Sequence, residues 1–192
     1  RCILMIAIID YGVGNLFSLS QSFKAINEQT IITSDEEVIK KADKLVLPGV
    51  GAFGDACQKL YQSKLDKVII EEVKKGKALL GVCLGMQMLF EESYEYGKHK
   101  GLGLIKGKVV DIDLPKEYKI PHIGWNGLHF AKASPILKYI KENDCVYFVH
   151  SYHAVDCDKS VVATTEYGKE LTAIVQNGNV FGCQFHPEKS GD

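Results

Sequence analysis

The chain has 192 residues, of which 46% are hydrophobic and 24% are charged, values typical of one ordinary globular domain. Its formal net charge of -1 gives no electrostatic argument for binding nucleic acid or an anionic membrane. The six cysteines form no C-x-x-C pair and no disulfide framework, which indicates reduced thiols and a cytoplasmic location. We therefore expect one domain over residues 1–192.

The first apolar run, residues 2–9, predicts a buried strand rather than a signal peptide. Asp10-Tyr-Gly12 follows it, where a signal peptide would have small residues around a cleavage site. No apolar run approaches the ~20 residues of a membrane-spanning helix. An alternative start of the native chain is Met5, in which case residues 1–4 do not belong to the domain.

Strands and amphipathic helices alternate along the first half of the chain. The predicted strands cover residues 5–10, 30–33, 44–47 and 78–82. Three helices are predicted between these strands. The first has an apolar face formed by Leu16, Leu19, Phe23 and Ile26, and the second starts at Asp35 with Ser34 as its cap. The third has an apolar face formed by Leu65, Val68, Ile69 and Val73 and ends at Gly76. This alternation predicts an α/β fold with three layers: a flavodoxin-like parallel or mixed sheet with helices on both faces.

The second half is predicted to be rich in strands, which favours an antiparallel extension of the same sheet. The predicted strands cover residues 101–110, 145–150, 161–165, 171–176 and 180–185. Asn177-Gly178 is typical of a two-residue hairpin turn, and Ser134-Pro135 predicts the start of a short helix. We expect one more helix over the sheet beyond Asp192, which implies a truncated C-terminus.

The stretch Gly81-Val-Cys-Leu-Gly-Met-Gln87 points most strongly to chemistry. It begins in a predicted strand, and Leu84, Met88 and Leu89 then recur at helical spacing. A nucleophile between two such glycines is typical of a nucleophile elbow, because residues without Cβ let strand and helix pass closely. A helix N-terminus favours the thiolate of Cys83, and the Leu84 N–H is placed to meet an oxyanion. The alternative is a buried, inert cysteine.

A second candidate motif, Phe185-His-Pro-Glu188, stands at the end of the last predicted strand. Proline favours extended backbone at His186, and residues i and i+2 of an extended segment project to one side. Glu188 is therefore predicted to orient the His186 imidazole, as a carboxylate does in a catalytic triad. Together with Cys83 the pair predicts covalent acyl transfer. The alternative is an ordinary loop. Three other cysteines are less suited to this role: Cys57, Cys157 and Cys183.

Three further stretches have competing interpretations. Gly49-Val-Gly-Ala-Phe-Gly54 matches a dinucleotide fingerprint but lacks the acidic strand end, so its backbone N–H groups are a better fit to an oxyanion hole. His150-Ser-Tyr-His153 has two histidines that would point apart, which argues against a metal site. Trp125 is expected on irregular structure, as loop packing or as a binding anchor. No cofactor and no metal are expected.

These motifs together resemble the class I, or triad, glutamine amidotransferases. The resemblance to one group, the glutaminase subunits of imidazole glycerol phosphate synthase in histidine biosynthesis, extends from residue 5 to the end of the chain. It is carried by residues 10–15, 48–54, 81–87, 121–126, 147–152 and 182–191. The final helix of that family and a match for residues 1–4 are both missing.

The resemblance implies that Cys83 attacks the side-chain amide of glutamine, that His186 transfers protons and that Glu188 orients it. Residues matching positions that hold the substrate are Gly51, Gln87, Glu95, Ser151 and Tyr152. Residues matching the backbone donors of the oxyanion hole are Val50 and Leu84, of which the Val50 peptide must turn to donate. Residues matching positions that face a partner are Asn15, Trp125, Tyr147 and Lys189.

The partner implied by the resemblance is a (β/α)8-barrel cyclase in a heterodimer, which receives the ammonia and makes imidazole glycerol phosphate and an aminoimidazole carboxamide ribotide. Members of the family are poor glutaminases alone and are activated by the ligand-bound partner. Three alternatives stay open: a paralogue that supplies ammonia to another synthase, such as one amidating a sugar; a non-catalytic regulatory subunit on the same fold; and a cysteine peptidase.

Overall fold

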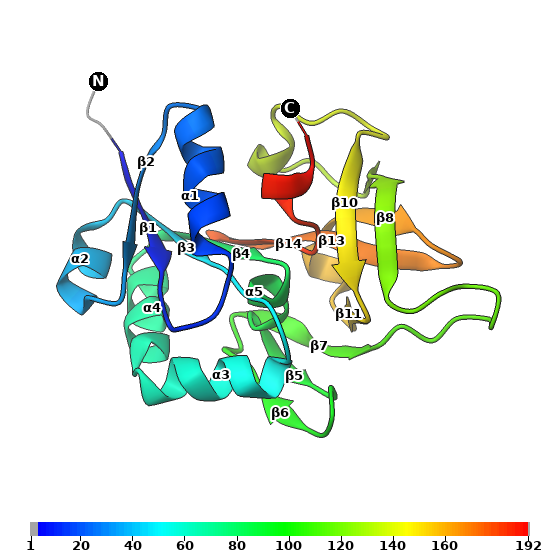
Figure 1. Cartoon of the computed structure of the whole chain (residues 1–192), viewed down its shortest axis with the longest axis horizontal. Coiled ribbons are helices and arrows are strands. Elements are labelled where there is room, and N and C mark those ends of the chain that lie inside the picture. Colours follow the sequence, from blue (N-terminus) through cyan, green and yellow to red (C-terminus); the bar gives the residue numbers. More distant parts are fainter. Residues whose placement is uncertain (1–3, 192) are drawn as a thin grey trace.

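The computed structural model describes residues 4–191 of the chain. Figure 1 shows a central sheet with helices packed against it, and a strand-rich second half beside it. The expectations about the native start of the chain and about a helix beyond residue 192 concern residues that, apart from Leu4, lie outside the described part. Within that part, no helix is long and apolar enough to cross a membrane.

The first half alternates strands and helices, as predicted. Its elements are β1 (Met5–Ile9), α1 (Leu16–Ala25), β2 (Gln29–Thr33), α2 (Glu36–Lys41), β3 (Lys44–Leu47), α3 (Phe53–Gln62), α4 (Leu65–Lys74), β4 (Ala78–Val82) and α5 (Leu84–Gln87). Helix α3 was not among the three helices that the apolar spacing predicted. Gly76 follows the end of α4 with a φ of +98°, the left-handed conformation that ends a helix.

The second half is dominated by strands. They are β5 (Phe90–Ser93), β6 (His99–Lys100), β7 (Ile105–Asp111), β8 (His122–Gly127), β9 (His129–Phe130), β10 (Cys145–His150), β11 (Tyr152–Val155), β12 (Val161–Glu166), β13 (Glu170–Asn177) and β14 (Val180–Cys183). Three single 3-10 turns, η1 (Pro135–Leu137), η2 (Asp158–Ser160) and η3 (Pro187–Lys189), complete the set.

The central sheet has eight strands in the order β2-β1-β3-β4-β14-β13-β12-β9. Strands β2 to β14 in this order run parallel, and β13, β12 and β9 pair antiparallel. The predicted α/β fold with an antiparallel extension is therefore confirmed. Beside it lie a four-stranded sheet, β11-β7-β5-β6, and a two-stranded ribbon, β10-β8.

Alternating side chains of the parallel strands build a core on each face of the sheet. Ala7 and Ile9 pack in the same core as α3 and α4, whereas Ile6 and Ile8 face the core that contains Leu19 of α1. Both cores are made by fully or nearly fully buried aliphatic residues, as expected for strands covered on both sides. The candidate catalytic residues Cys83 and His186 lie beyond the carboxyl ends of β4 and β14.

Several predicted boundaries were wrong for local reasons. Helix α2 is capped by Asp35 rather than Ser34, because the Asp35 carboxylate accepts from the N–H groups of Glu37 and Val38. The predicted strand 101–110 begins too early: β7 is Ile105–Asp111, and Gly101 instead packs directly against the Phe90 carbonyl. Ile26, predicted on a buried face, is 66% exposed because α1 ends before it.

One predicted turn and two predicted helices differ from the structure. The two-residue hairpin turn is Gly178-Asn179 rather than Asn177-Gly178, because Asn177 still pairs with Val180 and Gly178 has a positive φ. The helix after Cys83 is a single turn, and Met88 and Leu89 leave it to enter the core before β5. The predicted short helix after Ser134 is the 3-10 turn η1, which Ser134 caps through its hydroxyl.

Trp125 lies in a strand, not on irregular structure. It is part of β8 and pairs with Tyr147 of β10. The run Ile123-Gly-Trp-Asn126 has too few β-branched residues to predict a strand. It is held in one by its antiparallel partner β10, whose sequence is strongly strand-forming.

Candidate active site

Strands β4 and β14 bring Cys83 and His186 to the same edge of the sheet. The two strands are parallel neighbours, with Val82 paired to Cys183, so both chains leave the sheet in the same direction. The Cys83 N–H donates to the Cys183 carbonyl at 2.8 Å, which extends the ladder to the cysteine itself. Two segments far apart in the sequence are thereby fixed side by side.

Cys83 occupies a strained corner between β4 and α5. Its φ of 54° and ψ of -114° are unusual for a residue with a side chain. Gly85 passes so close to β3 that a Cβ there would overlap the Leu47 carbonyl oxygen, and a Cβ at Gly81 would lie 2.6 Å from the Gly85 carbonyl oxygen. The predicted elbow is present, and its glycines are required by this close approach.

His186 and Glu188 form the predicted pair, although by a different geometry. His186 Nδ1 lies 2.8 Å from Glu188 Oε1, and both side chains are almost completely buried. The segment is not extended throughout, because residues 187–189 form the turn η3 that brings the carboxylate back under the ring. The imidazole orientation is fixed by this contact and by the His186 N–H, which donates to the Tyr147 carbonyl at 3.0 Å.

The electrostatics of the site favour a protonated imidazole. Burial opposes the charged ring, but hydrogen bonds and charge interactions with Cys83 and Glu188 outweigh it and raise the pKa of His186 to about 9. The imidazole therefore lies between a thiol and a carboxylate that fixes its orientation, the grouping that nucleophilic catalysis by cysteine requires.

The other buried cysteines have the opposite character. Burial raises the pKa of the Cys57 thiol to about 12 and raises those of Cys157 and Cys183 as well. At Cys157 the neighbouring Asp156 and Asp158 also raise the pKa, but they contribute less than burial does. These thiols stay neutral, which argues against any of them as the nucleophile.

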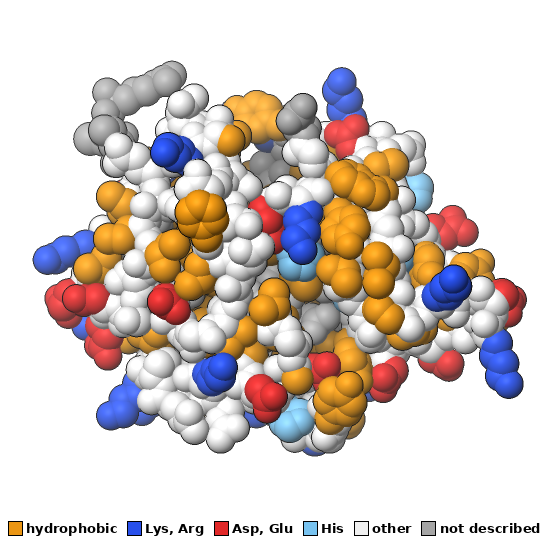
Figure 2. All heavy atoms as spheres, in the orientation of Figure 1, with side chains coloured by type: hydrophobic (Ala, Val, Ile, Leu, Met, Phe, Trp, Pro, Cys, Tyr) orange, Lys and Arg blue, Asp and Glu red, His pale blue; other side chains and the backbone are white. Residues whose placement is uncertain are grey.

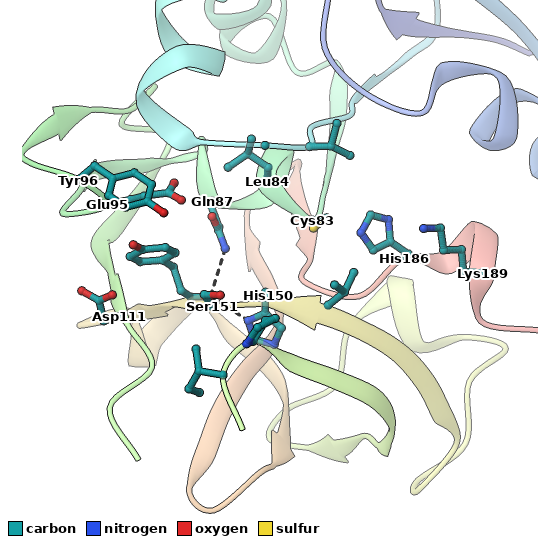
Figure 3. Close-up of a pocket in the computed structure, with 16 residues that line it drawn as sticks. Cys83, Leu84, Gln87, Glu95, Tyr96, Asp111, His150, Ser151, His186 and Lys189 are labelled. Atoms are coloured by element: carbon teal, nitrogen blue, oxygen red, sulfur yellow. Dashed lines mark hydrogen bonds between the residues drawn. The ribbon is translucent and has the colours of Figure 1, made fainter. Parts of the chain in front are cut away.

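A cavity of about 590 Å³ opens directly onto Cys83 and His186. It also reaches every residue that the resemblance assigned to substrate binding or the oxyanion hole: Val50, Gly51, Leu84, Gln87, Glu95, Ser151 and Tyr152. Figure 3 shows Cys83 and His186 facing each other, with Glu95, Tyr96 and Asp111 at the other end of the cavity. The structure thus gathers these residues around one space large enough for a small polar molecule.

The far end of the cavity is acidic. Glu95 is 8% exposed and accepts the Phe53 N–H at 2.6 Å, and burial raises the pKa of its carboxyl. Asp111 lines the same end, and its charge adds to burial in raising the pKa of Tyr152 to about 12. Sequence analysis did not identify Asp111 or Tyr96, because they come from β7 and the loop before β6, which carry no motif.

The glycine-rich stretch 49–54 serves packing and lines the cavity. A Cβ at Gly49 would lie 2.7 Å from the Gly85 N, and one at Gly54 would lie 2.6 Å from His99. His150 and His153 are both buried, with the His150 ring bonded to His122 and the Tyr152 carbonyl. Within residues 4–191 no cluster of three or more His, Cys, Asp or Glu side chains is arranged to hold a metal.

An apolar surface borders the cavity on the ribbon β8-β10. Its outward side chains are Ile123, Trp125, Tyr147 and Val149, of which Ile123 and Trp125 are more than half exposed. Figure 2 shows hydrophobic side chains gathered over this ribbon. The Lys189 ammonium lies 5.9 Å from the centre of the Tyr147 ring, and Trp125 lies 6.0 Å from it. Asn15 is the fourth residue predicted to face a partner, and its side chain caps the start of α1. Helix α1 contacts the turn η3, which contains Lys189.

Known proteins match this chain over nearly its whole length. Residues 7–192 match the family model described as glutamine amidotransferase class-I. The imidazole glycerol phosphate synthase subunit HisH of Aquifex aeolicus is 53% identical, covering 95% of this chain and 88% of that protein. The subunit of the same name from Lactococcus lactis is 51% identical over 97% of this chain and 92% of that protein.

Solved structures agree on the fold. A structure described as a glutamine amidotransferase has a TM-score of 0.75 at 18% identity, covering 95% of this chain and 90% of that one. The structure of PurLQS from Thermotoga maritima also has a TM-score of 0.75, at 22% identity, over 96% of this chain and 88% of that one.

Replacing Gly85 tests the close approach at the elbow. Gly85→Val should lower the free energy of unfolding by about 3 kcal/mol or more, because its side chain would overlap the backbone of β3. Gly127→Ala is a matched control, since a Cβ there would lie no closer than 3.4 Å to its neighbours. Urea unfolding of both variants measures the difference. Equal stability of Gly85→Val and the native chain would contradict the elbow argument.

The raised pKa of His186 predicts a pH dependence. Because the folded pKa of about 9 exceeds the ordinary 6.5, the protonated ring stabilises the fold fully below pH 6.5, and this contribution disappears as pH rises through 9. NMR titration of the ring should give a midpoint near 9 in the native chain. Cys83→Ala should lower that midpoint, since the Cys83 side chain is one of the two groups that raise the pKa of the ring. A midpoint near 6.5 in both would show that the thiol does not interact with the ring.

Proposed function

Because the chain belongs to the class I glutamine amidotransferases, and within them to the glutaminase subunits of imidazole glycerol phosphate synthase, we propose that Cys83, His186 and Glu188 hydrolyse glutamine through a cysteinyl thioester. The observation that carries this proposal is the pairing of β4 with β14, which holds a thiol at a strained corner beside a carboxylate-anchored imidazole.

The proposed reaction proceeds in two halves. The Cys83 sulfur attacks the side-chain carbonyl carbon of glutamine, and a C–S bond forms. His186 then gives its proton to the departing nitrogen, so the C–N bond breaks and ammonia leaves. In the second half His186 takes a proton from water, which attacks the thioester, and the C–S bond breaks to release glutamate and the thiolate. Glu188 keeps the ring oriented in both halves.

The remaining cavity residues would bind the substrate. The α-ammonium group of glutamine is cationic, and the acidic end of the cavity with Glu95 and Asp111 complements its charge. The backbone N–H groups of Leu84 and Val50 would stabilise the oxyanion, each such donor being worth ~10²–10³ in rate. Gln87, Ser151, Tyr152 and Gly51 would hold the rest of the molecule.

The ammonia is proposed to pass to a (β/α)8-barrel cyclase bound as a heterodimer partner. The relatives from Aquifex aeolicus and Lactococcus lactis are named as subunits of a synthase, which implies a partner. The exposed aromatic surface of β8 and β10, with Lys189 beside it, supports docking there, because exposed tryptophan and tyrosine are frequent interface anchors. A synthase that amidates another substrate would receive the same ammonia, so the partner decides between the two.

Glutamine turnover tests the proposed chemistry. With the cyclase and its nucleotide ligand present, the native chain should release glutamate, and Cys83→Ala should reduce the rate by at least about 10⁴-fold. Circular dichroism and partner binding should stay unchanged, since Cys83 is small and lies in the cavity wall. Turnover that persists in Cys83→Ala would refute the thioester route, and no turnover in either protein would favour a non-catalytic subunit.

Replacing Trp125 tests the proposed interface. Trp125→Ala should weaken binding of the cyclase by about 30-fold or more, as expected for loss of a central aromatic anchor. Tyr139→Ala is the control, because Tyr139 is 86% exposed but lies outside the ribbon β8-β10. Isothermal titration calorimetry measures both affinities. Equal effects of the two variants would place the partner elsewhere.

A further inference from the structure

Gln184 is a fully buried amide next to the nucleophile, and the proposed triad gives it no role. It follows β14 directly and is 0% exposed. Its backbone N–H donates to the Ala173 carbonyl of β13 at 2.8 Å, so its position is fixed by the sheet. A buried amide must satisfy its donors and acceptor within the protein, and its partners therefore indicate what it does.

The side chain of Gln184 connects Cys83 to Gln87. Its Nε2 lies 3.8 Å from the Cys83 Sγ and donates to it, and its Oε1 accepts from the Gln87 Nε2 at 3.0 Å. The Gln87 Nε2 also donates to the Tyr152 carbonyl at 3.2 Å. A continuous chain of hydrogen bonds therefore runs from the wall of the cavity, through two amides, to the sulfur.

The direction of this chain is set by the Tyr152 carbonyl, which is a backbone group and can only accept. Gln87 must turn its NH₂ toward that carbonyl, and the second hydrogen of the same NH₂ then points at Gln184. Gln184 must meet this hydrogen with its oxygen, which leaves its own NH₂ facing Cys83. Reversing either amide would place two donors or two acceptors together, so the assignment follows from the contacts themselves.

We propose that Gln184 is a further catalytic residue, whose amide donates a hydrogen bond to the Cys83 sulfur and holds the Gln87 amide in one orientation. An N–H directed at sulfur favours the thiolate, because hydrogen bonds to charged acceptors are stronger than those to neutral ones. Both hydrogens of the Gln87 NH₂ are used by the protein, so its Oε1 is the atom free to accept from a substrate N–H. The substrate part of this inference rests on the proposed function, and the contact with sulfur does not.

Two variants separate the two contacts of Gln184. Gln184→Glu keeps an acceptor for Gln87 but removes the N–H that faces the sulfur, and Gln184→Met removes both. Gln176→Glu and Gln176→Met are matched controls, because the Gln176 amide also makes one bond as acceptor, from Ser134, and one as donor, to Gly178. Gln176 lies on β13, the neighbouring strand.

Alkylation of Cys83 by iodoacetamide, quantified on its peptide by mass spectrometry, measures the contact with sulfur directly. At about pH 8 we expect Gln184→Glu to react about tenfold more slowly than the native chain, the loss of one hydrogen bond to a charged group. The deficit should narrow toward about pH 5.5, where the introduced carboxyl becomes protonated and again has a hydrogen to donate. Both Gln176 variants should react within about twofold of the native rate.

Steady-state kinetics with the partner present measure the second contact. Gln184→Glu should lower kcat for glutamine about tenfold and leave KM within about threefold, whereas Gln184→Met should also raise KM about tenfold because Gln87 is no longer held. A folded Gln184→Glu whose alkylation at about pH 8 is within about twofold of the native rate would overturn the proposal. If the alkylation deficit is present but the native chain turns over no glutamine, the contact stands and only the proposed function fails.

A measurement without any Gln184 variant covers the case in which those variants do not fold. In the NMR spectrum of the isotopically labelled chain, the side-chain NH₂ signals of Gln184 should shift on Cys83→Ala, and those of Gln176 should not. Unchanged Gln184 signals would overturn the proposal, because a donor that loses its acceptor must change its chemical shift.

Discussion

The parallel pairing of β4 with β14 is the constraint on which the rest of the site depends. The register places Gly81 opposite Gly182, and a Cβ at either position would collide with the elbow helix, at Gly85 and Met86 for Gly81 and at Met86 for Gly182. The two facing glycines therefore let α5 lie across the strand ends. Only this approach allows Cys83 to leave the sheet at a sharp corner while His186 leaves the neighbouring strand at the same edge.

Burial then decides which polar groups keep their charge. Cys57 and Cys183 are buried among apolar side chains with no cation to compensate, so their thiols remain neutral. His186 is buried as deeply, yet its ring faces Glu188 on one side and Cys83 on the other and gains more from them than it loses by desolvation. The same low-dielectric surroundings thus neutralise some groups and stabilise the charge of others, according to the side chains that face each group.

The sequence predicted what is encoded locally and missed what depends on distant pairing. The elbow, the His186–Glu188 pair and the alternation of the first half could be predicted because glycine spacing, proline and periodicity act over a few residues. Ser34 was preferred to Asp35 as a cap because both residue types cap helices and only the backbone path distinguishes them. Trp125 was misplaced because β8 is held by its pairing with β10, and Asp111 belongs to no motif. Gln184 lies in a motif, but its role was missed because its hydrogen-bond partners Cys83 and Gln87 are about 100 residues away in the sequence.

Strand β10 joins the two surfaces that the proposed function needs. Its inward side chain Phe148 packs edge-on against Phe185, the residue before His186, whereas its outward side chain Tyr147 belongs to the exposed aromatic surface. Both backbone groups of Tyr147 form hydrogen bonds with the segment that carries His186. The Tyr147 carbonyl accepts the His186 N–H, and the Tyr147 N–H donates to the Ser190 hydroxyl. The Ser190 hydroxyl in turn donates to the His186 carbonyl. The position of the His186 imidazole is therefore fixed by hydrogen bonds to the backbone of β10, the strand that also carries Tyr147 of the aromatic surface. A partner that moves this ribbon acts on the position of His186 through hydrogen bonds to the main chain of β10.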